Sequence, residues 1–227
     1  MKAVILAAGM GTRLGTLIPK PLTSLKDEKT ILDFQLEKLA DKVGQHNIYV
    51  IVGYKKEIIM EKFPHMIYIY NDAYTRNNTS KSLLFALNKI DEDVLWMNGD
   101  VFFDKKVLDL ICDSSESASL VDQSQCADEE IKYNLNDKGY IHDLSKQVKD
   151  GLGESVGINL IKKKDLDLFR EELKKVEESD YFEKALENLT ISDKLDLKPI
   201  NLGDLYCKEV DFEEDLEDVR KYLSEDK

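Results

Sequence analysis

The chain has 227 residues, of which 42% are hydrophobic and 34% are charged, and its formal net charge is -13. This composition is typical of one globular domain, and no apolar run approaches the length needed to cross a bilayer. The acidic charge argues against a nucleic-acid partner, since such binding draws on lysine and arginine. The three cysteines and three histidines are scattered, so no zinc site is expected. The apolar start is too short for a signal peptide, and we expect a cytoplasmic protein, monomeric or homodimeric.

Short aliphatic runs alternate with stretches of helical periodicity in the first half of the chain. This alternation predicts an α/β fold, Rossmann-like, with a mainly parallel sheet flanked by helices. Strands are expected at 3–7, 48–52, 66–70 and 94–97, with helices near 32–39, 58–63 and 83–87.

The second half has a different pattern. Two runs around the turn Asn136-Asp137-Lys138-Gly139 predict an antiparallel hairpin, a flap beside the parallel sheet. At the start of the closing helix, Asp211 and Glu214 have the spacing of a capping box. The expected elements are hairpin strands at 131–135 and 140–144, a strand at 156–161, helices at 165–178 and 181–189, and a strand at 205–210.

The first strand leads into a glycine-containing turn, within LAAGMGTRLGTLIPKPL at 6–22. Gly9 and Gly11 expose backbone N–H groups and let phosphate oxygens approach without a Cβ in the way. Leu14 stands where the dinucleotide-binding fingerprint needs its third glycine, and no G-K-[ST] of a P-loop is present. Both of those nucleotide-binding motifs are therefore excluded.

Two cations accompany this turn. Arg13 offers a planar fork for phosphate, and Lys20 lies between two prolines that restrict its backbone. Together with the glycines they predict a polyphosphate site. A tight strand-to-helix turn with surface cations is the alternative.

The strand at 94–97 leads to a carboxylate, Asp100. Ligands of open α/β sheets bind at the carboxyl ends of strands, so Asp100 is placed to hold Mg2+, which prefers oxygen ligands. The alternative is an aspartate that stabilises the turn after Asn98-Gly99. Many nucleotide-sugar glycosyltransferases carry Asp-x-Asp, but the next aspartate here is Asp104, which weakens a sugar-transfer interpretation.

The combination of LAAGMGTRL at 6–14 and PKPL at 19–22 resembles the signature of the nucleotidyltransferase superfamily. Its members include sugar-1-phosphate nucleotidyltransferases and bacterial phosphocholine cytidylyltransferases. The segment 15–18 is shorter than in many sugar-phosphate members. The resemblance implies that Lys20 lies between the α-phosphate and the acceptor. It implies nucleotide contacts for Leu6, Ala7, Ala8, Gly9, Gly11, Thr12 and Arg13.

The same resemblance extends to the metal and the base. It implies that Asp100 and Asp211 hold Mg2+, Asp211 resembling the late aspartate of the cytidylyltransferases. Helix capping is the alternative for Asp211. Asn78 and Ser82 resemble residues near the nucleotide base, and capping is again the alternative for Asn78.

Three residues resemble acceptor-binding positions, alongside Lys20. Glu154 lies in a Gly-Glu-x-x-Gly segment similar to the strand that faces the acceptor in many relatives. Tyr181 and Glu183 resemble the aromatic and acidic pair that cytidylyltransferases use around a cationic head group. Trp96 lies on a core strand, and we expect it to serve in packing.

The resemblance thus implies a cytidylyltransferase, with Lys20, Arg13, Asp100 and Asp211 as its catalytic set and Mg2+ as its cofactor. It would transfer CMP from CTP to a phosphocholine-like or phosphoethanolamine-like acceptor, or to a phosphorylated amino acid such as phosphoglutamine, for surface polysaccharide or lipid decoration. We expect one domain over 1–227, with a nucleotide-binding half up to residue 110 and an acceptor-binding half from residue 111. A sugar-1-phosphate nucleotidyltransferase and a non-catalytic nucleotide-sensing module are the alternatives.

Overall fold

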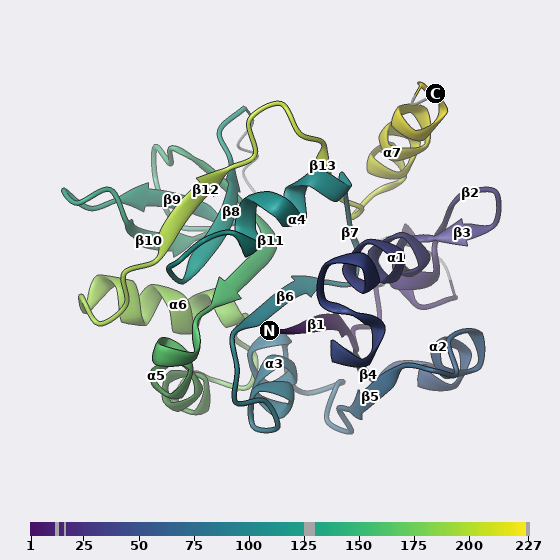
Figure 1. Cartoon of the computed structure of the whole chain (residues 1–227), viewed down its shortest axis with the longest axis horizontal. Coiled ribbons are helices and arrows are strands. Elements are labelled where there is room, and N and C mark those ends of the chain that lie inside the picture. Colours follow the sequence, from purple (N-terminus) through teal and green to yellow (C-terminus); the bar gives the residue numbers. More distant parts are fainter. Residues whose placement is uncertain (12–13, 16, 125–129, 226–227) are drawn as a thin grey trace.

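The computed structural model describes residues 1–11, 14–15, 17–124 and 130–225. Its central strands run parallel, as the sequence predicts, and they lie in the order β6-β1-β4-β5 (Figure 1). Helices cover both faces of these strands, which explains their nearly continuous aliphatic sequences. The four strands are β1 (Lys2–Ala7), β4 (Ile48–Val52), β5 (Ile67–Tyr70) and β6 (Val94–Asn98).

An antiparallel half extends this sheet through the long strand β11 (Gly153–Ile161), which pairs with β6, β8 and β9. The expected hairpin is present as β9 (Lys132–Leu135) and β10 (Ile141–Ser145). Strands β8 (Ala118–Asp122) and β12 (Lys198–Asn201) pair in parallel and were not predicted. Both are short, and β12 contains a proline, so neither has a clear strand pattern.

Helices on the two faces of the sheet enclose two hydrophobic cores. On one face, the ring of Trp96 stacks on Phe169 at 5.4 Å and meets Phe182 edge-on at 5.6 Å, which confirms its packing role. That face carries α3 (Thr79–Leu87), α5 (Lys163–Lys175) and α6 (Phe182–Ile191). The other carries α1 (Ile31–Val43), α2 (Lys56–Lys62) and α4 (Lys105–Cys112), of which α4 was not predicted. Within the described residues, no helix combines the length and apolarity that crossing a bilayer requires.

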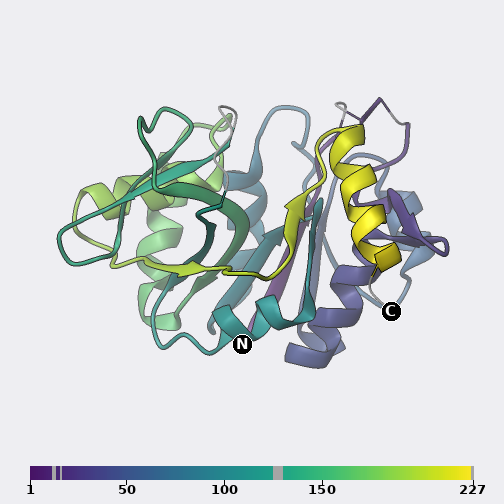
Figure 2. The same ribbon diagram turned by 90° about the horizontal axis from the view of Figure 1, so that it is seen from above.

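The end of the chain returns to the centre of the molecule. Strand β13 (Cys207–Glu209) pairs antiparallel with β7 (Val101–Phe103), directly after β6. Helix α7 (Glu213–Glu225) then packs on the small hairpin of β2 (Ser24–Lys26) and β3 (Lys29–Thr30) (Figure 2). Two short 3-10 turns complete the described elements, η2 (Lys20–Leu22) and η3 (Gln45–Asn47).

The capping of α7 differs from the prediction. The helix begins at Glu213, one residue later than a cap at Asp211 predicts, and the carboxylate that accepts from the backbone before the helix shifts by one residue as well. It belongs to Asp215 rather than Glu214, and it accepts from the backbone N–H groups of Asp211 and Phe212 at 3.0 and 2.8 Å. The fold class itself is confirmed: a mainly parallel central sheet flanked by helices, with smaller antiparallel parts.

Candidate functional site

A cavity of about 330 Å³ lies at the carboxyl ends of β1 and β6. Leu6 and Ala7 line it from the end of β1, and Asn98, Gly99 and Asp100 line it from the end of β6. This is the edge at which parallel α/β sheets bind their ligands. The glycine turn, η2, β11, the starts of α3 and α6, the ends of the β9–β10 hairpin and the end of β13 with the residues after it also contribute lining residues.

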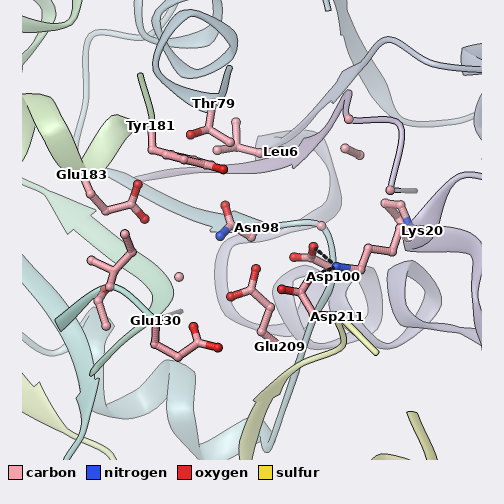
Figure 3. Close-up of a pocket in the computed structure, with 18 of the residues that line it drawn as sticks. Leu6, Lys20, Thr79, Asn98, Asp100, Glu130, Tyr181, Glu183, Glu209 and Asp211 are labelled. Atoms are coloured by element: carbon pink, nitrogen blue, oxygen red, sulfur yellow. Dashed lines mark hydrogen bonds and ion pairs between the residues drawn. The ribbon is translucent and has the colours of Figure 1, made fainter. Parts of the chain in front are cut away.

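Lys20 reaches into this cavity from η2 and is only 6% exposed. Its ammonium donates to Asp100 Oδ2 at 2.8 Å and to Asp211 Oδ1 (Figure 3). Burial alone would lower the pKa of Lys20, but the two carboxylates outweigh it and raise the pKa above its ordinary value. Lys20 is therefore a fixed cation.

Gly11 allows Lys20 to take this position. Its φ of +57° lies in the left-handed region, and a Cβ built on it would lie 2.7 Å from the Cβ of Lys20. The loop and the lysine backbone can pass this closely only because residue 11 has no side chain. Gly9 also lines the cavity and has nothing within 4 Å of its Cβ direction.

A third carboxylate joins Asp100 and Asp211. One oxygen of each of Asp100, Glu209 and Asp211 lies within 4.8 Å of the others. The β13–β7 register sets this grouping, because Glu209 pairs with Val101 and the N–H of Val210 donates to the Asp100 carbonyl at 2.9 Å. Burial, followed by the charges of Asp100 and Asp211, raises the pKa of Glu209 well above its usual range.

These carboxylates suit a divalent cation. Asp100 Oδ1 is buried and has no hydrogen-bond partner among the residues that the structure describes, although a buried polar oxygen without one costs free energy. Mg2+ takes one or two protein carboxylates together with substrate phosphates and water. The donor set of Asp100, Glu209 and Asp211 therefore fits Mg2+.

The opposite wall carries Tyr181 and Glu183 (Figure 3). Glu183 is 6% exposed, and its buried Oε2 has no hydrogen-bond partner in the described part of the chain. Burial raises the pKa of Glu183 to about 7. Glu130 and Lys146 line the same side, and the ammonium of Lys146 lies 5.7 Å from the centroid of the Tyr181 ring.

Two predicted base-side residues lie at the start of α3. Asn78 caps this helix, accepting from the N–H of Thr79 at 2.8 Å and donating to the Ser179 carbonyl at 3.1 Å. The Ser82 hydroxyl accepts from Asn71 Nδ2 at 2.9 Å in the interior. Thr79, between these two residues, lines the cavity, whereas Asn78 and Ser82 are not among its lining residues.

The other predicted residues divide into three groups. Lys20, Asp100, Asp211, Tyr181 and Glu183 line one cavity together with Leu6, Ala7, Gly9 and Gly11. Ala8, whose carbonyl accepts from the N–H of Tyr54 at 3.0 Å, and Glu154 on β11 are not among its lining residues. Thr12 and Arg13 lie outside the described residues.

Sequence reasoning missed three lining residues with charged side chains: Glu130, Lys146 and Glu209. A signal for Glu209 was available, because it precedes Asp211 by two positions and residues two apart in an extended segment share a face. No comparable pattern marks Glu130 or Lys146, which reach the cavity only through tertiary folding.

Much of the chain is similar in sequence to known transferases. Residues 3–132 match the family described as MobA-like NTP transferase domain. The UTP–glucose-1-phosphate uridylyltransferase AglF of Haloferax volcanii is 34% identical over 164 residues, 66% of this chain and 66% of that protein. The bifunctional protein GlmU of Methanococcus maripaludis is 32% identical over 168 residues, and the match covers 71% of this chain but 38% of GlmU. The chain thus matches only part of the length of these relatives.

A solved structure shares the fold along nearly the whole chain. The CTP:phosphocholine cytidylyltransferase LicC of Streptococcus pneumoniae has a TM-score of 0.82, with 98% of both chains covered. Its sequence identity is 23%, so the likeness is one of fold.

Proposed function

Because the chain belongs to the MobA-like NTP transferase domain family, we propose that it is a Mg2+-dependent cytidylyltransferase, transferring CMP from CTP to a small phosphorylated acceptor. The observation that carries this proposal is the position of Lys20, whose ammonium contacts both Asp100 and Asp211 at the ends of the parallel strands. A fixed cation beside a carboxylate cluster suits a reaction between two phosphate groups.

In this reaction an oxygen of the acceptor phosphate attacks the α-phosphorus of CTP. The new P–O bond forms as the bond to the α–β bridging oxygen breaks, and pyrophosphate leaves with that electron pair. No strong base is needed, because a phosphomonoester with a second pKa of about 6 is mostly a dianion at neutral pH. The protein's task is to position two anions and offset their charge.

The proposed roles follow from position in the cavity. The backbone of Gly9 and Gly11 would receive the triphosphate. Arg13, which lies outside the described residues, is assigned to the outer phosphates by the sequence resemblance alone. Lys20 would hold the α-phosphate and the acceptor phosphate together. Asp100 and Asp211, aided by Glu209, would hold Mg2+, which when bound supplies a positive charge for phosphate oxygens.

CTP and a small phosphorylated amine are the substrates we favour. The extent of the fold likeness to LicC, named for CTP and phosphocholine, supports this choice, as do Tyr181 and Glu183 on the acceptor side of the cavity. The relative AglF, named for UTP and glucose 1-phosphate, favours a second candidate, a sugar-1-phosphate nucleotidyltransferase.

A pyrophosphate-release screen tests the proposal. The four ribonucleoside triphosphates and dTTP are crossed with sugar 1-phosphates and phosphorylated amines in the presence of Mg2+. We expect the highest turnover with CTP and a phosphorylated amine, and none when EDTA removes the metal. Release with UTP and glucose 1-phosphate alone would select the second candidate. Tight nucleotide binding without release from any pair would contradict both and favour a nucleotide sensor.

A further inference from the structure

The acceptor side of the cavity presents Glu183 and Lys146, whose charges attract each other although no hydrogen bond or ion pair joins them within the described residues. Glu183 carries a buried oxygen that has no hydrogen-bond partner in residues 1–11, 14–15, 17–124 and 130–225. Lys146 lines the same wall and, within the described residues, makes no hydrogen bond or ion pair through its ammonium. A ligand that satisfies this wall needs a hydrogen-bond donor for Glu183 and an anionic group for Lys146.

The position of Lys146 also disfavours a quaternary ammonium head group. Its ammonium lies 5.7 Å from the Tyr181 ring centroid, within cation–π range, so it already uses that ring. A quaternary ammonium bound on the same ring would meet a like charge close by. It would also leave Glu183 Oε2 unsatisfied, because a quaternary ammonium has no N–H group to donate.

A primary ammonium, unlike a quaternary one, can donate a hydrogen bond to Glu183. It carries three N–H donors, so it can reach the buried oxygen of Glu183. The repulsion from Lys146 remains unless the acceptor brings an anion of its own. A carboxylate beside the amine supplies that anion and forms a charge-assisted contact with the lysine.

We propose that the acceptor is a phosphorylated amino acid, whose ammonium is held by Glu183 and whose carboxylate is held by Lys146. Lys146 is then the residue that selects acceptors with a carboxylate over choline-type ones. This inference rests on the proposed function, since it names the substrate class of that same site.

Three commercial acceptors separate the possibilities because they share a phosphomonoester on a two-carbon chain. Phosphoethanolamine has a primary ammonium, O-phosphoserine adds a carboxylate to it, and phosphocholine replaces its N–H groups with methyl groups. The readout is kcat/KM for pyrophosphate release with Mg2+ and the triphosphate that the screen selects. We expect O-phosphoserine to lead phosphoethanolamine by about tenfold or more, with phosphocholine last.

The variant Lys146→Met identifies the residue responsible. It should lower kcat/KM for O-phosphoserine by about ten- to a hundredfold, mainly through KM, and raise kcat/KM for phosphoethanolamine, whose ammonium no longer meets a like charge. Activity with phosphocholine should rise, since the ammonium on Tyr181 is gone. Lys149→Met is the matched control, because Lys149 is exposed in the same loop and does not line the cavity.

The outcomes separate this inference from the proposed function. Pyrophosphate release from no pair at all refutes the function. Turnover with sugar 1-phosphates only leaves nucleotidyl transfer standing but overturns the proposal of a phosphorylated amino acid. The same holds if phosphocholine or phosphoethanolamine is at least as good a substrate as O-phosphoserine. An equal loss with all three acceptors in Lys146→Met would show a structural lysine and overturn its selective role.

Discussion

The ammonium nitrogen of Lys20 lies 2.8 Å from Oδ2 of Asp100, and Asp211 accepts a hydrogen bond from the same ammonium. The cation that we assign to the phosphates is thus held by the carboxylates that we assign to the metal. A lysine and a divalent ion that share oxygens compete for them. The arrangement allows a direct test of metal binding that does not depend on turnover.

Replacing Lys20 with methionine should strengthen metal binding. The variant leaves three neighbouring carboxylates without their ammonium, so we expect Mn2+, used as a probe for Mg2+, to bind about tenfold tighter or more. The dissociation constant is measured by electron paramagnetic resonance without nucleotide. Lys146→Met is the control, because it removes the same charge from the same cavity without breaking these ion pairs. Equal or weaker Mn2+ binding by Lys20→Met would contradict the shared site.

The same lysine should matter more for turnover than for nucleotide binding. We expect Lys20→Ala to lower kcat by about 10²–10³, the usual cost of removing one group that stabilises transition-state charge. The dissociation constant for CTP should change far less, because the glycine turn keeps its backbone N–H groups. Kinetics and nucleotide titration are compared with Lys149→Ala, an exposed lysine. Near-normal kcat in Lys20→Ala would remove this residue from the mechanism.

Gly11→Ala should be more harmful than the same change at Gly15. Both glycines have a left-handed φ, +57° and +64°, so both substitutions carry the backbone cost of about 1–2 kcal/mol. Only the Cβ at residue 11 would clash, at 2.7 Å from Lys20 Cβ, whereas nothing lies within 4 Å at residue 15. We expect Gly11→Ala to lose additional stability in urea unfolding and to lower kcat. Equal losses in the two variants would show that the contact with Lys20 is unimportant.

Glu183 should make stability depend on pH. Its pKa is raised from an ordinary 4.5 to about 7 by burial, so between these values the folded protein binds more protons than the unfolded chain. Stability therefore falls as pH rises from 4.5 to 7 and is level above that, a loss of about 3 kcal/mol from this group. The neutral variant Glu183→Gln should lack this component.

The comparison is made by urea unfolding at pH 5 and pH 8. We expect the wild type to lose stability relative to Glu183→Gln as the pH rises. Glu178→Gln, at an exposed position, provides the control for removal of a surface charge. A constant difference between wild type and Glu183→Gln at the two pH values would mean that Glu183 does not titrate in this range.

The parallel part of the sheet could be predicted because its strands are unusual in composition. Strands β1 and β4 are buried on both faces and therefore read as continuous aliphatic runs. Strand β12 is exposed or half-buried along its length and carries a proline, so its sequence does not distinguish it from a loop. Its place in the sheet comes from pairing with β8 alone.

The candidate site divides in a similar way. Lys20 could be predicted because its proline-flanked position is a local feature of the sequence. Lys146 could not, since the hairpin brings it to Tyr181 across more than thirty positions of the sequence. Asn78 has two explanations in its sequence context, and its capping hydrogen bond at 2.8 Å is the one visible in the structure.

The pairing of β13 with β7 has a consequence for the order in which the protein is made. The turn with Gly9 and Gly11 and the strand before Asp100 leave the ribosome first, whereas Glu209 and Asp211 come more than a hundred residues later. A nascent chain can therefore form the turn that we assign to the triphosphate before it can bring together the three carboxylates that we assign to the metal. The proposed metal site is complete only after β13 has docked on β7.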